Sequence, residues 1–243
     1  MKWNWQQPDW PDFRWNSEAL AALEARFLQQ SGVMIGVVKH LGGEDRTNII
    51  LDVMTDEAMK TLQIEGELLN RHSVQSSLRR EFGLETEARR IPLAERGIAA
   101  MMMSLYRSFG DPLTEQVLSE WHRMVLSGRS DIDAVGRYRE YEDAMQVVSG
   151  ALHKPAVHFE APPSSAMASE MKQFLDWFAE SGPGGKAPLP ALTRSGLAHL
   201  YFVSIHPFED DNGRIGRAIS EKALSQAIGQ PSLIALSQTI QRK

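Results

Sequence analysis

The chain of 243 residues contains no cysteine. It therefore has no disulfide framework, no thiolate nucleophile and no cysteine-type zinc site. It also lacks a long hydrophobic run, since its longest apolar stretch, VMIGVV, is too short to cross a bilayer. The opening residues, MKWNWQQPDW, have none of the apolar region of a secretory signal. These absences predict a soluble cytoplasmic protein without a membrane partner.

An excess of positive charge is missing as well. The chain has 26 lysines and arginines against 31 acidic residues, which gives a net charge of -5. Nucleic acids and anionic membranes select a basic face, so we expect no nucleic-acid partner. The length is sufficient for a substantial core, organised as one large domain or two small ones.

Apolar residues recur at helical spacing along most of the chain, which predicts a mainly α protein. Asn16 and Ser17 are residue types that begin helices, and they precede SEALAALEARFLQQ. The segment before them, WNWQQPDWPDFRW, holds four tryptophans among prolines. We expect this arm to be extended and to pack on the body of the protein.

One region departs from the helical pattern. Residues 145–163, MQVVSGALHKPAVHFEAPP, contain two β-branched alternating stretches around a glycine-containing turn. This pattern predicts a β-hairpin. Because a lone hairpin cannot form a core, it is more often a flap over a site or an edge for a partner.

The stretch HPFEDDNGRIGR, residues 206–217, carries the strongest chemical signal. Pro207 disfavours helical geometry at His206, so one helix is predicted to end there and a second to begin near Gly213. The first turn of that second helix offers free N–H groups to an anion. Arg214 and Arg217 lie on one face of the turn, so the expected ligand is multiply negative, such as a polyphosphate.

Three adjacent acids precede these arginines, and they repel one another unless solvent, a metal ion or positive charge is near. Asp210 could hold a magnesium ion that shares phosphate oxygens, and His206 could take a proton from an incoming hydroxyl. Plainer interpretations are that His206 caps or packs and that Arg217 pairs with Glu221. A zinc site of His199, His206 and Asp210 is disfavoured, because there is no HExxH motif and the arginines would repel the metal.

This stretch resembles the signature of the Fic family, His-x-Phe-x-acid-Gly-Asn-Gly-Arg-x-x-Arg, and departs from it only where Asp211 replaces a glycine. The hairpin and the Trp/Pro-rich start are similar to features of one bacterial branch. The resemblance implies a mainly α fold, a Fic-like helical bundle with a small β-hairpin flap. Residues 1–90 would form an N-terminal extension and inhibitory-helix region. Residues 91–243 would form the catalytic core, with an expected truncation at the C-terminal end.

Family members mostly transfer AMP from ATP to a hydroxyl of a target protein, so the resemblance implies a protein adenylyltransferase. His206 would be the general base, Phe208 would anchor the loop and Asp210 would bind Mg2+. The nucleotide would be bound by four further residues, Asn212, Gly213, Arg214 and Arg217. The flap residues Val147, Val148, Ser149 and Gly150 would hold a protein target by main-chain pairing, and self-modification is a further expectation.

A second match lies upstream. TLQIEG, residues 61–66, resembles the family's inhibitory motif, Ser/Thr-x-x-x-Glu-Gly/Asn. By this resemblance Glu65 pairs with Arg217 and keeps the γ-phosphate from binding productively. Two alternatives remain open: a degenerate Fic fold that binds nucleotide or protein without transfer, and an enzyme that removes AMP, with Glu65 positioning the water.

Asp211 is the acid whose place is hardest to justify. Its carboxylate could turn outward and cap the N–H groups of the second helix. It could instead face the phosphate cradle and repel the phosphates. We expect the second arrangement, because capping would occupy the donors that a phosphate needs.

Overall fold

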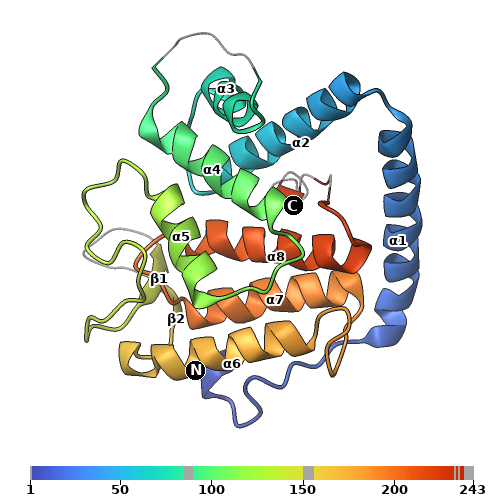
Figure 1. Cartoon of the computed structure of the whole chain (residues 1–243). Coiled ribbons are helices and arrows are strands. Elements are labelled where there is room, and N and C mark those ends of the chain that lie inside the picture. The colour runs from blue at the N-terminus through green and yellow to red at the C-terminus, as the bar shows by residue number, and fades with distance from the viewer. Residues whose placement is uncertain (1, 85–89, 150–155, 233, 235, 238–243) are drawn as a thin grey trace.

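The computed structural model describes residues 2–84, 90–149, 156–232, 234, 236 and 237. Figure 1 shows a mainly helical protein with one small two-stranded sheet. Its helices are α1 (Ser17–His40), α2 (Gly43–Ile64), α3 (Arg71–Glu81), α4 (Leu93–Arg107), α5 (Glu115–Val125), α6 (Met167–Glu180), α7 (Ala191–Ile205) and α8 (Asn212–Ile228). The strands are β1 (Gln146–Ser149) and β2 (Ala156–Glu160), and short 3-10 turns cover Asn4–Gln6 and Ser164–Ala166. The predicted fold class is confirmed.

The α7–α8 pair lies at the centre of the molecule (Figure 1). These two helices share the largest packing interface, with α6 against α7 and with α4 and α5 against α8. They approach closely at Gly216, where an added Cβ would lie 3.0 Å from Val203 Cγ1. The core around them includes the fully buried aromatic residues Phe174, Tyr201, Phe202 and Phe208. This rigid pair positions the loop that carries residues 206–211.

The N-terminal third surrounds that centre. Asn16 accepts a hydrogen bond from Ala19 N (2.9 Å), so the predicted start of α1 is confirmed. Glu24 on α1 accepts hydrogen bonds from Leu192 N (2.9 Å) and Thr193 N (2.8 Å) in the first turn of α7. A carboxylate at a helix N-terminus is favourable, so α1 is tied to α7 at that end. Helix α2 then packs against α3 and α4 and reaches α8.

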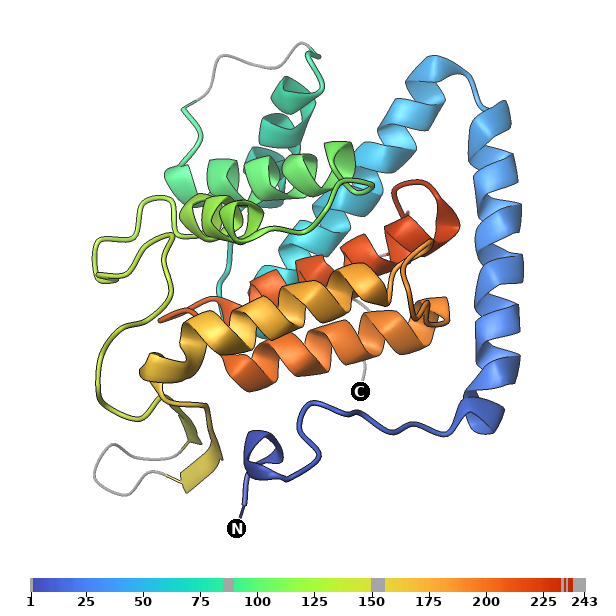
Figure 2. The same cartoon turned by 60° about the horizontal axis from the view of Figure 1, so that its bottom comes forward.

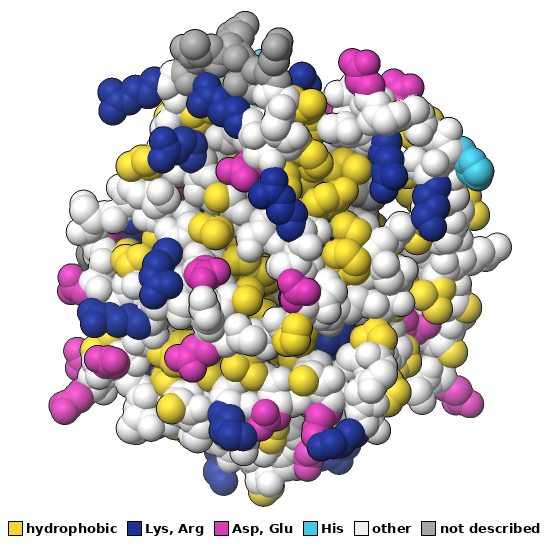
Figure 3. Space-filling model, in the orientation of Figure 1, with side chains coloured by type: hydrophobic (Ala, Val, Ile, Leu, Met, Phe, Trp, Pro, Cys, Tyr) yellow, Lys and Arg dark blue, Asp and Glu magenta, His cyan; other side chains and the backbone are white. Residues whose placement is uncertain are grey.

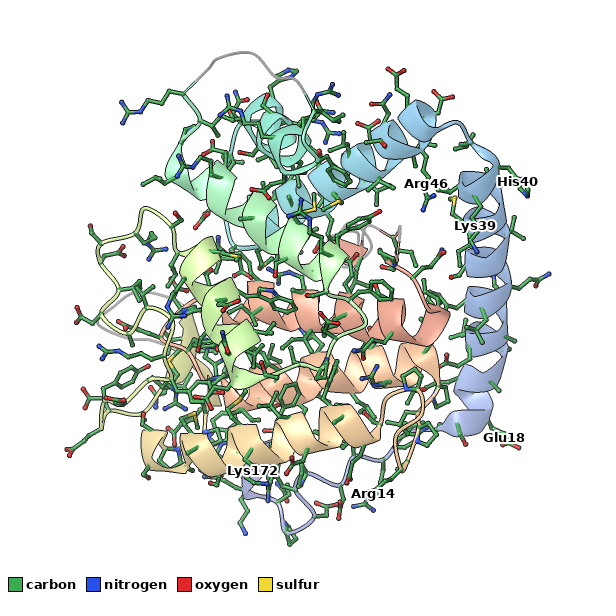
Figure 4. All side chains as sticks on the ribbon, in the orientation of Figure 1. Arg14, Glu18, Lys39, His40, Arg46 and Lys172 are labelled. Atoms are coloured by element: carbon green, nitrogen blue, oxygen red, sulfur yellow. The ribbon has the colours of Figure 1, made fainter. Side chains whose placement is uncertain are left out.

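Charged side chains follow the polarity of α1. Figure 4 shows Glu18 at its first turn and Lys39 and His40 at its last turn. An acid near the N-terminus and bases near the C-terminus both interact favourably with the helix dipole. On the face seen in Figure 3, basic and acidic side chains are interspersed rather than gathered by sign.

The two strands pair antiparallel, with Val147 opposite Phe159 and Val148 opposite Val157, and with an irregularity between Val147 and Val148. The predicted hairpin strands are therefore present, while Gly150 lies outside the described residues. The N-terminal arm was expected to be extended. It instead makes a 3-10 turn at residues 4–6 before it passes along α7, as Figure 2 shows.

Within the part of the chain that the structure describes, the search for a helix of sufficient length and apolarity to cross a membrane found none.

Candidate active site

His206 ends helix α7, as predicted, in the left-handed conformation (φ 53°, ψ 58°). This conformation is uncommon for a residue with a side chain and points to a constraint at the site. Its backbone N–H donates to Phe202 O (3.0 Å), and its carbonyl accepts from Arg139 Nε (2.8 Å). The histidine is therefore held by its backbone at both ends.

The imidazole of His206 is oriented by one contact. Nδ1 lies 3.2 Å from the carbonyl oxygen of Val203, and a carbonyl can only accept, so Nδ1 carries the proton. Burial lowers the pKa of His206 below its usual value, and the charge of Arg139 acts in the same direction. The ring is therefore neutral at physiological pH and presents an unprotonated Nε2.

Two side chains shape the loop that follows. Phe208 is fully buried and stacks on His122 with ring centroids 4.1 Å apart, so its predicted place in the core is confirmed. Asn212 Oδ1 accepts from Phe208 N (2.9 Å), and Asn212 Nδ2 donates to Phe208 O (2.9 Å). The Asn212 side chain is turned into its own loop. Any contribution from Asn212 to an anion site is thus limited to its backbone.

Gly213 lies directly against Glu65, the acid of the TLQIEG motif. A Cβ at this position would be 2.5 Å from Glu65 Oε1 and 3.2 Å from Arg217 Nη1. Only a residue without a side chain leaves room for Glu65 here. The first turn of α8 and the end of α2 therefore meet at this glycine.

Arg217 is buried and is occupied by the upstream motif. Its Nε donates to Thr61 Oγ1 (2.6 Å), and its Nη2 donates to Thr61 O (3.1 Å) and to Glu65 Oε1 (2.7 Å). The expected contact between Glu65 and Arg217 is thus present. The simpler pairing of Arg217 with Glu221 is wrong, since Glu221 accepts from Ser232 Oγ instead (3.1 Å).

Arg214 is also buried and meets two carboxylates. It forms a two-pronged ion pair with Glu67, with Nη2 at 2.8 Å from Oε1 and Nη1 at 3.2 Å from Oε2. Its Nε lies 2.5 Å from Asp211 Oδ1. Neither Asp211 oxygen has a hydrogen-bond partner among the described residues, so this close contact is an ion pair without the alignment of a hydrogen bond.

Asp211 departs from the capping arrangement. It precedes α8 with φ 62° and makes no side-chain hydrogen bond to the first turn. Its carboxylate is buried, and burial raises its pKa to about 6, against the lowering effect of Arg214. The capping alternative is therefore wrong, and the acid is turned inward onto an arginine of the anion cradle.

Asp210 is half exposed and faces a third arginine. Its Oδ1 accepts from Asp211 N (2.7 Å), and its Oδ2 lies 3.2 Å from Arg129 Nη2. Arg129 also binds Asp131 through two contacts of 2.7 Å. Glu209, the acid before Asp210, accepts a hydrogen bond from Ala134 N (3.0 Å).

The donor set fits magnesium better than zinc. Among the described residues no group of three or more histidines, cysteines and acids is arranged to hold a metal, so the zinc alternative is wrong. Magnesium is commonly bound by one or two carboxylates together with substrate phosphates. The partly exposed carboxylate of Asp210 meets that requirement, with Arg129 as its competitor.

Three residues of this site were not identified from the sequence: Glu67, Arg129 and Arg139. Glu67 is two positions beyond Glu65, in EGE, and this spacing carries no general signal. Arg129 and Arg139 lie in the segment between α5 and β1, far along the chain from residues 206–217. Their contacts depend on how that segment folds back onto the loop.

The fold and the site define a class of helical protein in which a histidine ends one central helix and a Gly-Arg turn opens the next. Residues 112–224 match the profile of the Fic/DOC family, so the resemblance seen in the sequence is confirmed for that part of the chain. Residues 3–84 match a second profile, described as a domain of unknown function (DUF4172).

Several known proteins are similar to this chain. The "Protein adenylyltransferase Fic" of Nematostella vectensis is 30% identical over 124 residues, which is 51% of this chain and 26% of that protein. A Fic family protein from Desulfovibrio desulfuricans G20 superposes with a TM-score of 0.61 at 22% identity, covering 90% of this chain and 62% of that one. A Fic domain containing signaling protein from Bacteroides thetaiotaomicron gives 0.61 at 23% identity, with coverages of 82% and 72%. The chain thus spans about a quarter of the curated relative, and the structural likenesses concern the fold.

Proposed function

We propose that this protein is an adenylyltransferase that moves AMP from ATP to a hydroxyl side chain of a protein. The observation that carries the proposal is the neutral His206, whose Nδ1 is held by Val203 O so that Nε2 is free to accept a proton. The histidine directly precedes a loop that leads into the arginine-bearing turn of α8. A base beside an anion cradle is what phosphoryl-group chemistry requires.

The hydroxyl oxygen of the target attacks the α-phosphorus of ATP while His206 Nε2 takes the hydroxyl proton. The new P–O bond joins AMP to the target, and the bond between the α-phosphorus and the bridging oxygen breaks. Pyrophosphate leaves with the electron pair of that bond. Positioning of the phosphates relative to the base supplies most of the rate.

The chain's own groups have distinct parts in this proposal. Arg217 and Arg214, once free of their carboxylates, pair with the outer phosphates. Backbone N–H groups at the start of α8 receive the inner phosphates. Asp210 would hold Mg2+, which neutralises phosphate charge when bound.

The same contacts argue for autoinhibition, which is also part of the proposal. Glu65 occupies Arg217, and Glu67 occupies Arg214. Both acids directly follow helix α2, so one short segment occupies both arginines and keeps them from a phosphate ligand. Two charge-assisted contacts must be exchanged before a triphosphate can pair with the arginines.

Labelled ATP tests the reaction type. The Glu65→Gly protein is incubated with Mg2+ and ATP labelled at the α- or the γ-phosphate, and label in protein is measured. Transfer of α-label alone, lost in the Glu65→Gly protein that also carries His206→Ala, is the expected result. Transfer of γ-label would mean a kinase and would contradict the proposal.

The pH dependence gives a second check on His206. Because the base must be neutral, α-label transfer should rise with pH through a value below 6.5 and level off by pH 7. A profile that continues to rise above pH 8 would exclude His206 as the titrating base.

A second function is favoured by one observation. Asp211, buried against Arg214, adds negative charge where phosphates would approach. A Fic fold that binds nucleotide or a protein partner without transfer is consistent with it. In the labelling experiment this alternative gives nucleotide binding with no label in protein. Loss of AMP from a pre-labelled protein, dependent on Glu65, would instead identify an enzyme that removes AMP.

A further inference from the structure

The N-terminal arm, defined as residues 2–13, contacts the β1–β2 hairpin. Trp5 Nε1 donates a hydrogen bond of 2.7 Å to the carbonyl oxygen of Glu160, the last residue of β2. The ring of Trp3 meets Phe159 edge to face, with centroids 5.6 Å apart. Figures 1 and 2 both show the arm ending beside the strands.

The arm is also joined to the helix that carries His206. Asn4 Nδ2 donates to Ser204 Oγ (2.5 Å), two residues before His206. Farther along the arm, Trp10 packs edge to face on Tyr201 (5.1 Å) and donates from Nε1 to Glu170 Oε2 (3.0 Å). Residues 3–5 therefore connect the hairpin directly to the end of α7.

The hairpin needs such support. A two-stranded sheet by itself is marginally stable in water, and every residue of β1 is exposed. At its base, Ala161 N donates to Met145 O (2.9 Å) and Arg139 Nη2 donates to Pro162 O. The contacts of Trp3 and Trp5 lie on β2 itself.

The opposite side of the hairpin is open. Among the described residues β1 pairs with β2 alone, so its outer edge has free backbone groups. Val147 and Val148 of β1 and Val157 of β2 are 41%, 49% and 41% exposed. An exposed edge with apolar side chains suits an extended peptide that adds as a further strand.

We propose that the N-terminal arm positions this edge, where the family resemblance already places a segment of a target protein, relative to His206. Trp5, Trp3 and Asn4 are then positioning residues, which act through the hairpin and touch neither nucleotide nor the reacting atoms. Apolar side chains of the bound segment would lie against the exposed valines. This inference rests on the proposed transfer to protein, whereas the positioning of the hairpin by the arm is a property of the fold alone.

Amide hydrogen exchange tests the positioning directly. Trp5→Phe removes the indole N–H and retains an aromatic ring, and Trp3→Ala removes the edge contact with Phe159. Residues 156–160 should exchange faster by about tenfold in each variant, the effect of losing one hydrogen bond or ring contact. Trp15→Phe is the matched control, since Trp15 is an exposed tryptophan close to the arm and makes no hydrogen bond or ring contact with the described residues of the hairpin. Unchanged exchange in Trp5→Phe, Trp3→Ala and Asn4→Ala would overturn the proposal.

The same substitutions in the Glu65→Gly background test the consequence for docking. Transfer of α-label to protein should fall severalfold in the Trp5→Phe protein, while the Kd for Mg-ATP stays the same, because the arm touches no residue of the anion cradle. Faster exchange with undiminished transfer would overturn the docking role. Absence of transfer in the Glu65→Gly parent would defeat the proposed function instead, and the exchange result would still decide whether the arm positions the hairpin.

Discussion

At the scale of single residues, the site is governed by acids that occupy arginines. Arg217 meets Glu65, and Arg214 meets both Glu67 and Asp211. Burying a guanidinium without a partner would be costly, so Glu65 and Glu67 stabilise the arginines in the absence of a ligand. Under the proposed function a phosphate ligand must replace these acids, so the strength of each pair should set the affinity for nucleotide.

Under the proposed function, Glu67 should weaken nucleotide binding in the same way as Glu65. In the Glu65→Gly background, Glu67→Gln removes the charge that pairs with Arg214 and should tighten Mg-ATP binding about tenfold, equivalent to about 1.4 kcal/mol. Calorimetric titration measures the Kd. Glu44→Gln, on the exposed first turn of the same helix α2, is the control and should leave the Kd unchanged. An equal Kd with and without the Glu67 charge would show that Arg214 is not needed for the nucleotide.

Asp211 should cost stability above pH 6. Its pKa is raised by burial to about 6 in the folded protein from 3.8, so the folded state holds a proton that the unfolded state has lost between those values. Stability then falls as pH rises from about 4 to 6. Asp211→Asn, which also tolerates positive φ, should stabilise the protein by up to about 3 kcal/mol above pH 7 and by little at pH 4.

Urea unfolding of the unmutated and Asp211→Asn proteins at several pH values measures the difference in their free energies of unfolding. Groups that titrate alike in both proteins contribute equally, so their effects cancel in this difference. A stabilisation that is the same at pH 4 and pH 8 would mean that the carboxylate does not titrate as described. Asp211→Gly adds the release of backbone strain at φ 62° and should be at least as stabilising.

At the scale of elements, the loop between α7 and α8 is a self-supporting unit. The sequence predicted where it begins, because Pro207 opposes helical geometry at the preceding residue. It also predicted that Phe208 anchors it. It did not predict that Asn212 closes the loop by bonding both backbone groups of Phe208, since that contact appears only when the chain turns back on itself.

Replacement of Asn212 should loosen this unit. Asn212→Ala leaves the buried N–H and C=O of Phe208 without partners and should cost on the order of 2 to 4 kcal/mol in the free energy of unfolding. Asn48→Ala, an exposed change on α2, should stay within about 0.5 kcal/mol. Denaturant unfolding compares the two, and a loss below 1 kcal/mol for Asn212→Ala would show that the loop holds its shape by other contacts.

The other elements were predictable to different degrees. Helix α7 begins at Ala191, where Pro190 precedes its first turn and Glu24 of α1 accepts from Leu192 N. The strands β1 and β2 followed from alternating β-branched residues. The 3-10 turn at residues 4–6 was missed, since it is closed by local hydrogen bonds such as Trp3 N to Gln6 Oε1 (3.0 Å).

At the scale of the whole molecule, the end of α2 links the N-terminal region to the start of α8. Residues 61–67 contribute Thr61, Glu65 and Glu67 to α8, so the segment acts as a ligand that the chain supplies to itself. Under the proposed function, nucleotide binding exchanges these intramolecular contacts for contacts with phosphate. A substitution that weakens the contacts of this segment should therefore lower the stability of the free protein and raise its affinity for nucleotide.

Thermal unfolding with and without nucleotide tests that linkage. Glu65→Gly should lower the Tm of the free protein, because buried Arg217 loses a charge-assisted partner. It should also enlarge the rise in Tm on addition of Mg-ATP, since a ligand at 100 times its Kd adds about 2.7 kcal/mol. Gln63→Gly, an exposed change in the last turn of α2, controls for backbone freedom. A rise in Tm with Mg-ATP equal to that of the unmutated protein would contradict competition at Arg217.

The sequence by itself determined the helical class, the hairpin strands, the end of α7 at His206 and the anion-type chemistry of residues 206–217, because helical periodicity, turn residues and motif spacing are local properties. It also indicated Glu65 by resemblance. The tertiary structure decided the rest: that Glu67 and Asp211 share Arg214, that Arg129 faces Asp210, and that Trp5 reaches Glu160. These pairs join residues that lie far apart in the chain or depend on backbone geometry at a single turn, and packing alone brings them within contact distance.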